Sequence, residues 1–200
     1  MSARYESALT GSHTEAIAAV FSRQKLFGEH AASQLDDEGF FAPPAEGMNS
    51  PAVLCRHIGG NLQSRFTDLL TSDGEKPWRD RDAELAPIGA MTPDAAAVAR
   101  REIMQVWDQG WSVLFETIAS LRPEDLDRVV VIRGVEHSVM AALARSMDHI
   151  AAHVGQLNLL ARLRVGTERW RWFTLPPGGT AEFNAALRSK AQERLSGAER

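Results

Sequence analysis

The residues from Ser138 to Arg164, SVMAALARSMDHIAAHVGQLNLLARLR, decide the fold. Ser138 is the predicted N-cap of a helix, because a serine oxygen can accept a hydrogen bond from the backbone of the first turn. Apolar side chains then recur on one helical face, at Val139, Leu143, Ile150 and Leu157. A helix with such a face buries it against other elements. We therefore predict a long helix here that packs onto the core of a helical protein.

Three further stretches have helical periodicity and a clear start. Residues 12–35 begin with Ser12 and Glu15 in the pattern of a capping box. Residues 50–70 begin with Ser50-Pro51, and residues 92–118 with Thr92-Pro93, which places proline at the first helical position. Together with residues 138–164, these stretches predict an all-α fold, a four-helix bundle, as a single domain over residues 1–200.

The segments between these helices give further expectations. Residues 71–91 are long enough to travel the length of a bundle, so we predict a long crossover connection between helices 2 and 3. The acidic run 36–39 is expected to end the first helix, and residues 129–135 to form a small hairpin. A short C-terminal helix is expected from about Thr180. Gly59-Gly60 costs the second helix about 1 kcal/mol per glycine, which predicts close approach of a neighbouring backbone.

Composition narrows the classes of function. The net charge is −4 and the charges are mixed along the chain. The sequence has no basic stripe of the kind that binds nucleic acid, so a nucleic-acid partner is not expected. The arginines at 162–171 are interpreted as a solvated helix end. No apolar run reaches the length of a membrane span, and the N-terminus lacks a signal-peptide pattern. A single cysteine, Cys55, rules out an intrachain disulfide, so a cytoplasmic location is expected.

Three of the six histidines form a candidate metal site. His149 and His153 are four residues apart, so both imidazoles lie on one helical face and can converge on one ion. Such a pair alone is more often structural than metal-binding. His57 strengthens the metal interpretation, because it shares a helical face with Asn61 among apolar neighbours and needs a polar partner there. A hydrogen bond between helices is the simpler alternative, and Ile150 excludes the His-Glu-x-x-His motif of metalloproteases.

These residues and their surroundings resemble the DinB-like family of metalloenzymes, in particular one uncharacterised bacterial branch. The resemblance covers about residues 12–184 and is carried by RHIGGNL (56–62), RFTDLLTSDGEK (65–76), MDHIAAHVGQ (147–156) and Phe183-Asn184. It implies a four-helix bundle with a crossover connection and a divalent metal held by His57, His149 and His153. It also implies a homodimer, and relatives include transferases and isomerases that use low-molecular-weight thiols.

Three imidazoles leave a coordination position open, which is typical of catalytic rather than structural sites. Zinc or nickel is expected first, and iron, manganese or copper would also suit the site. Asn61 is the candidate for a residue that supports the ligands or binds substrate, and Gln156 is a weaker one. Asp73 and Glu75 either line the site or belong to an ordinary charged loop. The sequence favours a metal-dependent transferase or hydrolase acting on a small molecule, with a thiol as cosubstrate; the alternative is a non-catalytic metal-binding or dimerisation bundle.

Overall fold

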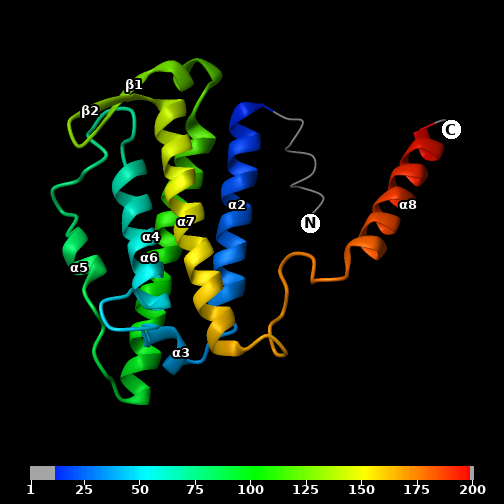
Figure 1. Cartoon of the computed structure of the whole chain (residues 1–200). Coiled ribbons are helices and arrows are strands. Elements are labelled where there is room, and N and C mark those ends of the chain that lie inside the picture. Colours follow the sequence, from blue (N-terminus) through cyan, green and yellow to red (C-terminus); the bar gives the residue numbers. More distant parts are fainter. Residues whose placement is uncertain (1–11, 199–200) are drawn as a thin grey trace.

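The computed structural model describes residues 12–198, and the side chains up to residue 193. Four long helices lie side by side in it (Figure 1): α2 (His13–Ala32), α4 (Pro51–Phe66), α6 (Pro93–Ser120) and α7 (Val139–Val165). The described part of the chain also contains α3 (Asp37–Phe41), α5 (Arg81–Leu85), the 3-10 helix η1 (Pro123–Asp127), the strands β1 (Val129–Ile132) and β2 (Val135–Ser138), and the C-terminal helix α8 (Thr180–Ala198). The prediction of a mostly helical protein is confirmed.

All four predicted helix starts are confirmed by their hydrogen bonds. The side chain of Ser12 accepts from the backbone of Glu15 in a complete capping box. Ser50, Thr92 and Ser138 each accept a hydrogen bond from the backbone N–H three residues further on. Each cap satisfies one of the backbone donors that a helix leaves unpaired at its start. The starts of the long helices are therefore set by local sequence.

Several boundaries differ from the expectations. The acidic run does not simply end the first helix: α2 ends at Ala32, and Asp36 caps the short helix α3. Helix α4 ends at Phe66, four residues earlier than predicted, and the connection that follows contains α5. The C-terminal helix α8 has 19 residues and is longer than expected. The predicted hairpin is present, with antiparallel pairing of β1 and β2 around Arg133 and Gly134, both at positive φ.

Helices α4 and α6 come into backbone contact at glycines, as Gly59-Gly60 predicted. A Cβ at Gly59 would lie 2.5 Å from the carbonyl oxygen of Val106, and one at Gly110 would lie 2.4 Å from the carbonyl oxygen of Gly59. Trp107 and Trp111, next to this contact, are fully buried in the core. Both helices run in the same direction in Figure 1, and the connection between them returns along the outside of α4 through α5.

The segment after α7 folds back on the helices. Trp170 is buried, Phe173 stacks on Phe27, and His30 donates a hydrogen bond from Nε2 to the carbonyl of Arg171 over 2.6 Å. Helix α8 follows this segment and stands apart from the other helices (Figure 1). No helix among residues 12–198 combines the length and the apolar character needed to cross a membrane.

Candidate metal centre

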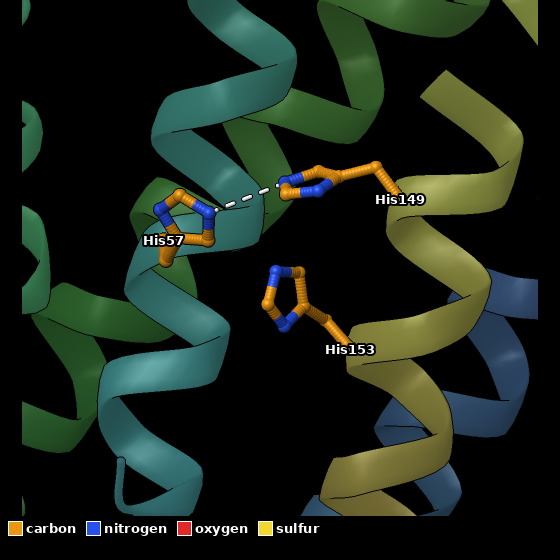
Figure 2. A group of neighbouring side chains, drawn as sticks. All are labelled: His57, His149 and His153. Carbon is orange, nitrogen blue, oxygen red and sulfur yellow. Dashed lines mark hydrogen bonds between the residues drawn. The ribbon is translucent and has the colours of Figure 1, made fainter. Parts of the chain in front are cut away.

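The structure brings His57, His149 and His153 together, as the sequence predicted. His57 comes from α4, whereas His149 and His153 come from successive turns of α7 and point toward it (Figure 2). One nitrogen from each of the three rings lies within 4.8 Å of the others. His57 is buried, and the other two are partly exposed. The arrangement can present three nitrogen donors to one ion.

The spacing of the nitrogens fits a metal. His57 Nε2 and His149 Nε2 are 3.2 Å apart. Two nitrogens bound to one tetrahedral ion at about 2.0–2.1 Å are separated by roughly 3.3–3.4 Å, so the observed pair needs little adjustment. The same separation also allows a hydrogen bond between the two rings. The geometry therefore admits both interpretations that the sequence left open.

A carboxylate that sequence reasoning missed selects the nitrogen that His57 presents. Glu84, on the short helix α5, lies with Oε2 3.1 Å from His57 Nδ1. An ionised carboxylate can only accept, so Nδ1 carries the proton and Nε2 is left bare toward the other histidines. Carboxylate–histidine pairs of this kind orient the ligands of metal sites and raise their basicity.

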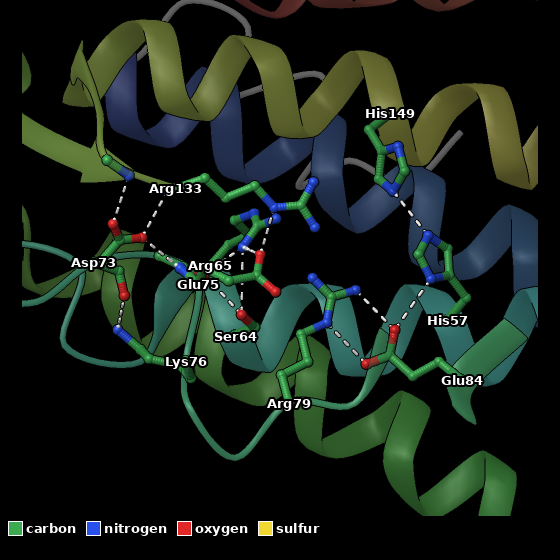
Figure 3. A network of polar contacts seen from close by, with 12 residues as sticks. His57, Ser64, Arg65, Asp73, Glu75, Lys76, Arg79, Glu84, Arg133 and His149 are labelled. Carbon is green, nitrogen blue, oxygen red and sulfur yellow. Dashed lines mark hydrogen bonds and ion pairs between the residues drawn. The ribbon is translucent and has the colours of Figure 1, made fainter. Parts of the chain in front are cut away.

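Glu84 is itself held in place by Arg79. The arginine donates from Nε and Nη2 to the two carboxylate oxygens, over 2.9 and 2.7 Å (Figure 3). Burial acts to raise the pKa of Glu84, but the hydrogen bonds from Arg79 and His57 outweigh it and lower the pKa. Gly60 makes room for this carboxylate, since a Cβ there would lie 2.1 Å from Glu84 Oε1. The glycine pair in RHIGGN was the one signal in the sequence that something approaches α4 here.

His153 is oriented within its own helix. Its Nδ1 lies 2.9 Å from Gln156 Oε1, and an amide oxygen only accepts, so Nδ1 carries the proton. The unprotonated nitrogen of His153 is then Nε2, as for His57, and it is the atom that can coordinate a metal ion. Of the two polar residues that the sequence suggested as supports, Gln156 therefore contacts a histidine directly. Asn61 is buried one turn from His57 and lines the adjacent pocket, and no hydrogen bond joins it to these histidines within residues 12–198.

The protonation states suit metal binding. Burial, followed by the charges of the neighbouring histidines and arginines, lowers the pKa of His149 to about 4. Burial also lowers the pKa of His153, although its hydrogen bond with Gln156 acts in the opposite direction. Both rings are therefore neutral near pH 7, which is the form that binds a metal.

A pocket of about 340 Å³ opens beside the histidines. His57, Asn61 and His149 line it together with further residues of α4, α7, the long connection and the hairpin of β1 and β2. Pockets that hold small ligands start at about this size. The pocket gives a small molecule access to the side of the centre where His57 and His149 meet.

Asp73 and Glu75 serve the fold rather than the centre. Asp73 accepts hydrogen bonds from the backbone of Arg133 and Gly134, both over 2.8 Å, and so ties the long connection to the hairpin (Figure 3). Glu75 pairs with Arg65 and Arg133. The interpretation of these two residues as part of a charged loop is thus the better one, and their contacts also shape one wall of the pocket.

The other histidines and the cysteine lie outside the centre. His13 is exposed at the start of α2, and His137 Nδ1 lies 2.9 Å from the carbonyl oxygen of Val135. His30 is half-buried against the C-terminal segment. Burial raises the pKa of the Cys55 thiol to about 12, as expected for a small buried side chain rather than a nucleophile.

Comparison with known proteins identifies a family for this chain. No curated protein matches the chain. Residues 9–179 match the family described as "Protein of unknown function (DUF1572)", a domain family of the DinB-like type. The matched segment contains all three histidines, Glu84 and Arg79. It ends before α8 and therefore before Phe183-Asn184, which belong to the stretch that resembles the DinB-like family. The chain therefore belongs to the DUF1572 family.

Proposed function

We propose that this protein is a metal-dependent enzyme of the DinB-like type, with one divalent ion held by His57, His149 and His153. The supporting observation is the convergence of three imidazoles beside a pocket. On this proposal the four long helices are the four-helix bundle of that superfamily, with residues 67–92 as its crossover connection. Zinc or nickel is the proposed ion, followed by iron, manganese and copper.

The proposed reaction is a transfer or hydrolysis on a small molecule, with a low-molecular-weight thiol as cosubstrate. A bound ion would supply a position that lowers the pKa of a water or holds a thiolate. The chain's own contribution is to fix the donor nitrogens: Glu84 keeps the proton of His57 on Nδ1, and Gln156 does the same for His153. Asn61, at the pocket wall, is the proposed hydrogen-bonding residue for substrate.

Metal analysis tests the binding half of this proposal. Protein purified without nickel resin is expected to contain about one equivalent of a divalent metal, measured by elemental analysis. Replacement of His57, His149 and His153 together by alanine is expected to abolish it. His13→Ala removes an exposed histidine away from the pocket and should leave the metal content unchanged. Equal metal content in the triple variant and the wild type would contradict the proposal.

Turnover tests the catalytic half. Metal-loaded protein is screened with pairs of thiols and electrophiles, and any activity is expected to disappear in the triple histidine variant. Activity that survives loss of the three histidines would exclude the enzymatic version.

A second candidate function is a metal-binding or dimerisation module without turnover. It is favoured by Leu159 and Leu163, which are four residues apart on α7 and 60% and 69% exposed. Two large apolar side chains on one helical face suit a homodimer contact. A dimer in light scattering that becomes a monomer in Leu159→Gln/Leu163→Gln would support it, whereas a wild-type monomer would exclude dimerisation.

A further inference from the structure

The pocket beside the histidines is lined by more positive than negative charge. Its lining residues include five arginines, at positions 65, 79, 81, 133 and 145, and one acidic residue, Asp148. Two further carboxylates, Glu75 and Glu84, pair with arginines of this set. Five guanidinium groups therefore face three carboxylates, an excess of two positive charges in a chain whose net charge is −4.

The arginines are not equally committed to ion pairs. Arg65 and Arg133 share Glu75, and Arg79 holds Glu84. Arg81 and Arg145 are exposed, and neither forms an ion pair within the described part of the chain. Positive charge without a protein partner is thus located at the rim of the pocket.

Two buried polar atoms on the pocket-lining residues also lack a hydrogen-bond partner. One is Nη1 of Arg79, whose side chain is only 1% exposed, and the other is Oγ of Ser146, which is 6% exposed. Figure 3 shows the free nitrogen of Arg79 pointing away from Glu84, which takes the other two. Buried polar groups without partners are costly, so each such group calls for an explanation, such as an ordered water or an ion that binds there. Here both atoms can donate to the same kind of acceptor.

We propose that this pocket recognises an anionic group, a carboxylate or a phosphate, on a small-molecule substrate. Arg79 Nη1 and Ser146 Oγ donate to its oxygens, and Arg145 and Arg81 supply charge at the rim. This inference rests on the proposed function, because it names the substrate class of that site. Arg79 would then bind two groups, because its other two nitrogens donate to Glu84 and Glu84 accepts from His57. Arg79 and Glu84 would therefore connect the bound anion to His57, one of the three proposed metal ligands.

Titration of the metal-free protein with simple anions tests the proposal without the metal. Inorganic phosphate and succinate are added at constant ionic strength in the presence of a chelator, and binding is followed by NMR shifts or calorimetry. Saturable binding of at least one probe is expected. Phosphate alone or succinate alone assigns the group, and both together support the shared chemistry.

Variants locate the binding. Ser146→Ala removes one buried donor to a charged group and is expected to weaken binding by about tenfold or more. Arg145→Gln, at the rim, is expected to weaken it by about two- to fivefold. Arg101→Gln makes the same charge change on an exposed part of α6 away from the pocket and should have no effect. Melting curves of all three variants confirm that they fold.

The outcomes separate this inference from the proposed function. No saturable binding of either probe, or binding that Ser146→Ala and Arg145→Gln leave unchanged, overturns the anion site even if the histidines bind metal. Anion binding that responds to these variants in a protein that never acquires metal supports the anion site and contradicts only the metal centre.

Discussion

At the scale of single residues, Glu84 sets the chemistry of His57. Its carboxylate accepts a hydrogen bond from Nδ1–H of His57, and Arg79 keeps the carboxylate ionised and in position. The buried pair costs desolvation energy, which its hydrogen bonds must offset. An arrangement of this kind is expected where a ring has to present one particular nitrogen.

Glu84→Gln is therefore expected to weaken metal binding without removing a ligand. The amide oxygen can still accept from His57, but the negative charge is lost and Arg79 loses its ionic partner. Loss of such supporting residues typically reduces metal affinity by about 10–100-fold. A competition titration against a chelating dye measures the change. Asp82→Asn, an exposed neutralisation on the same short helix, should bind like the wild type, and equal affinities for all three proteins would show that Glu84 does not support the centre.

The histidines could be predicted from sequence, whereas their supports could not. His149 and His153 share a helical face by spacing alone, and His57 and Asn61 do the same on α4. Glu84 lies 27 residues from His57 in a connection without periodicity, so no local rule brings the two together. Only the folded path of that connection does. For the same reason the free donor of Arg79 is visible only in three dimensions.

At the scale of elements, the contact between α4 and α6 depends on glycine. Gly59 and Gly110 face each other, and each lacks the Cβ that would collide with the other helix. This contact places α4, and with it His57, at a fixed height along the neighbouring helices. Backbones that approach so closely also gain dispersion contacts along their length.

Gly59→Ala and Gly110→Ala are expected to destabilise the protein, because a methyl group would overlap backbone atoms that cannot move independently. Overpacking of this kind costs about 1–3 kcal/mol. Gly155→Ala is the matched control: it lies in α7 with nothing within 4 Å of its Cβ position. It should stabilise by up to about 1 kcal/mol, since alanine is the better helix former. Urea denaturation compares the three variants, and a similar gain at all three positions would refute the close contact.

Sequence predicted the long helices well and the short ones poorly. Each long helix begins with a residue whose side chain can cap it, and a long periodic run follows the cap. These N-caps are Ser12, Ser50, Thr92 and Ser138. The five-residue helices α3 and α5 are too short to be stable alone. They form because Asp36 and Asp80 cap them and because the surrounding structure holds them, and their sequences carry no periodicity that would reveal this.

At the scale of the whole molecule, α8 contributes little to the core. None of its described side chains, up to residue 193, is buried, and Figure 1 shows it apart from the other helices. The family match ends at residue 179, just before it. The preceding segment, by contrast, packs Trp170 and Phe173 against the helices.

A chain that ends at residue 179 is therefore expected to keep its melting temperature and its metal content. A chain that ends at Val165 also loses the packing of Trp170 and should melt at a lower temperature. In a protein of this size a loss of 1 kcal/mol lowers Tm by about 2–4 °C. Calorimetry or circular dichroism measures the melting temperature of both truncated chains. A drop of about 2–4 °C or more on removal of α8 alone would show that α8 does stabilise the rest of the protein.

The course of residues 86–92 has one more consequence. This stretch is almost wholly exposed and separates the part of the chain that carries His57 and Glu84 from the part that carries both histidines of α7. A single cut there would leave two fragments, each with an incomplete set of donors, that meet along α4 and α6. On the proposed function, the metal ion would then bridge the two separate polypeptides. The fraction of fragments that reassemble would therefore depend on the concentration of the metal ion.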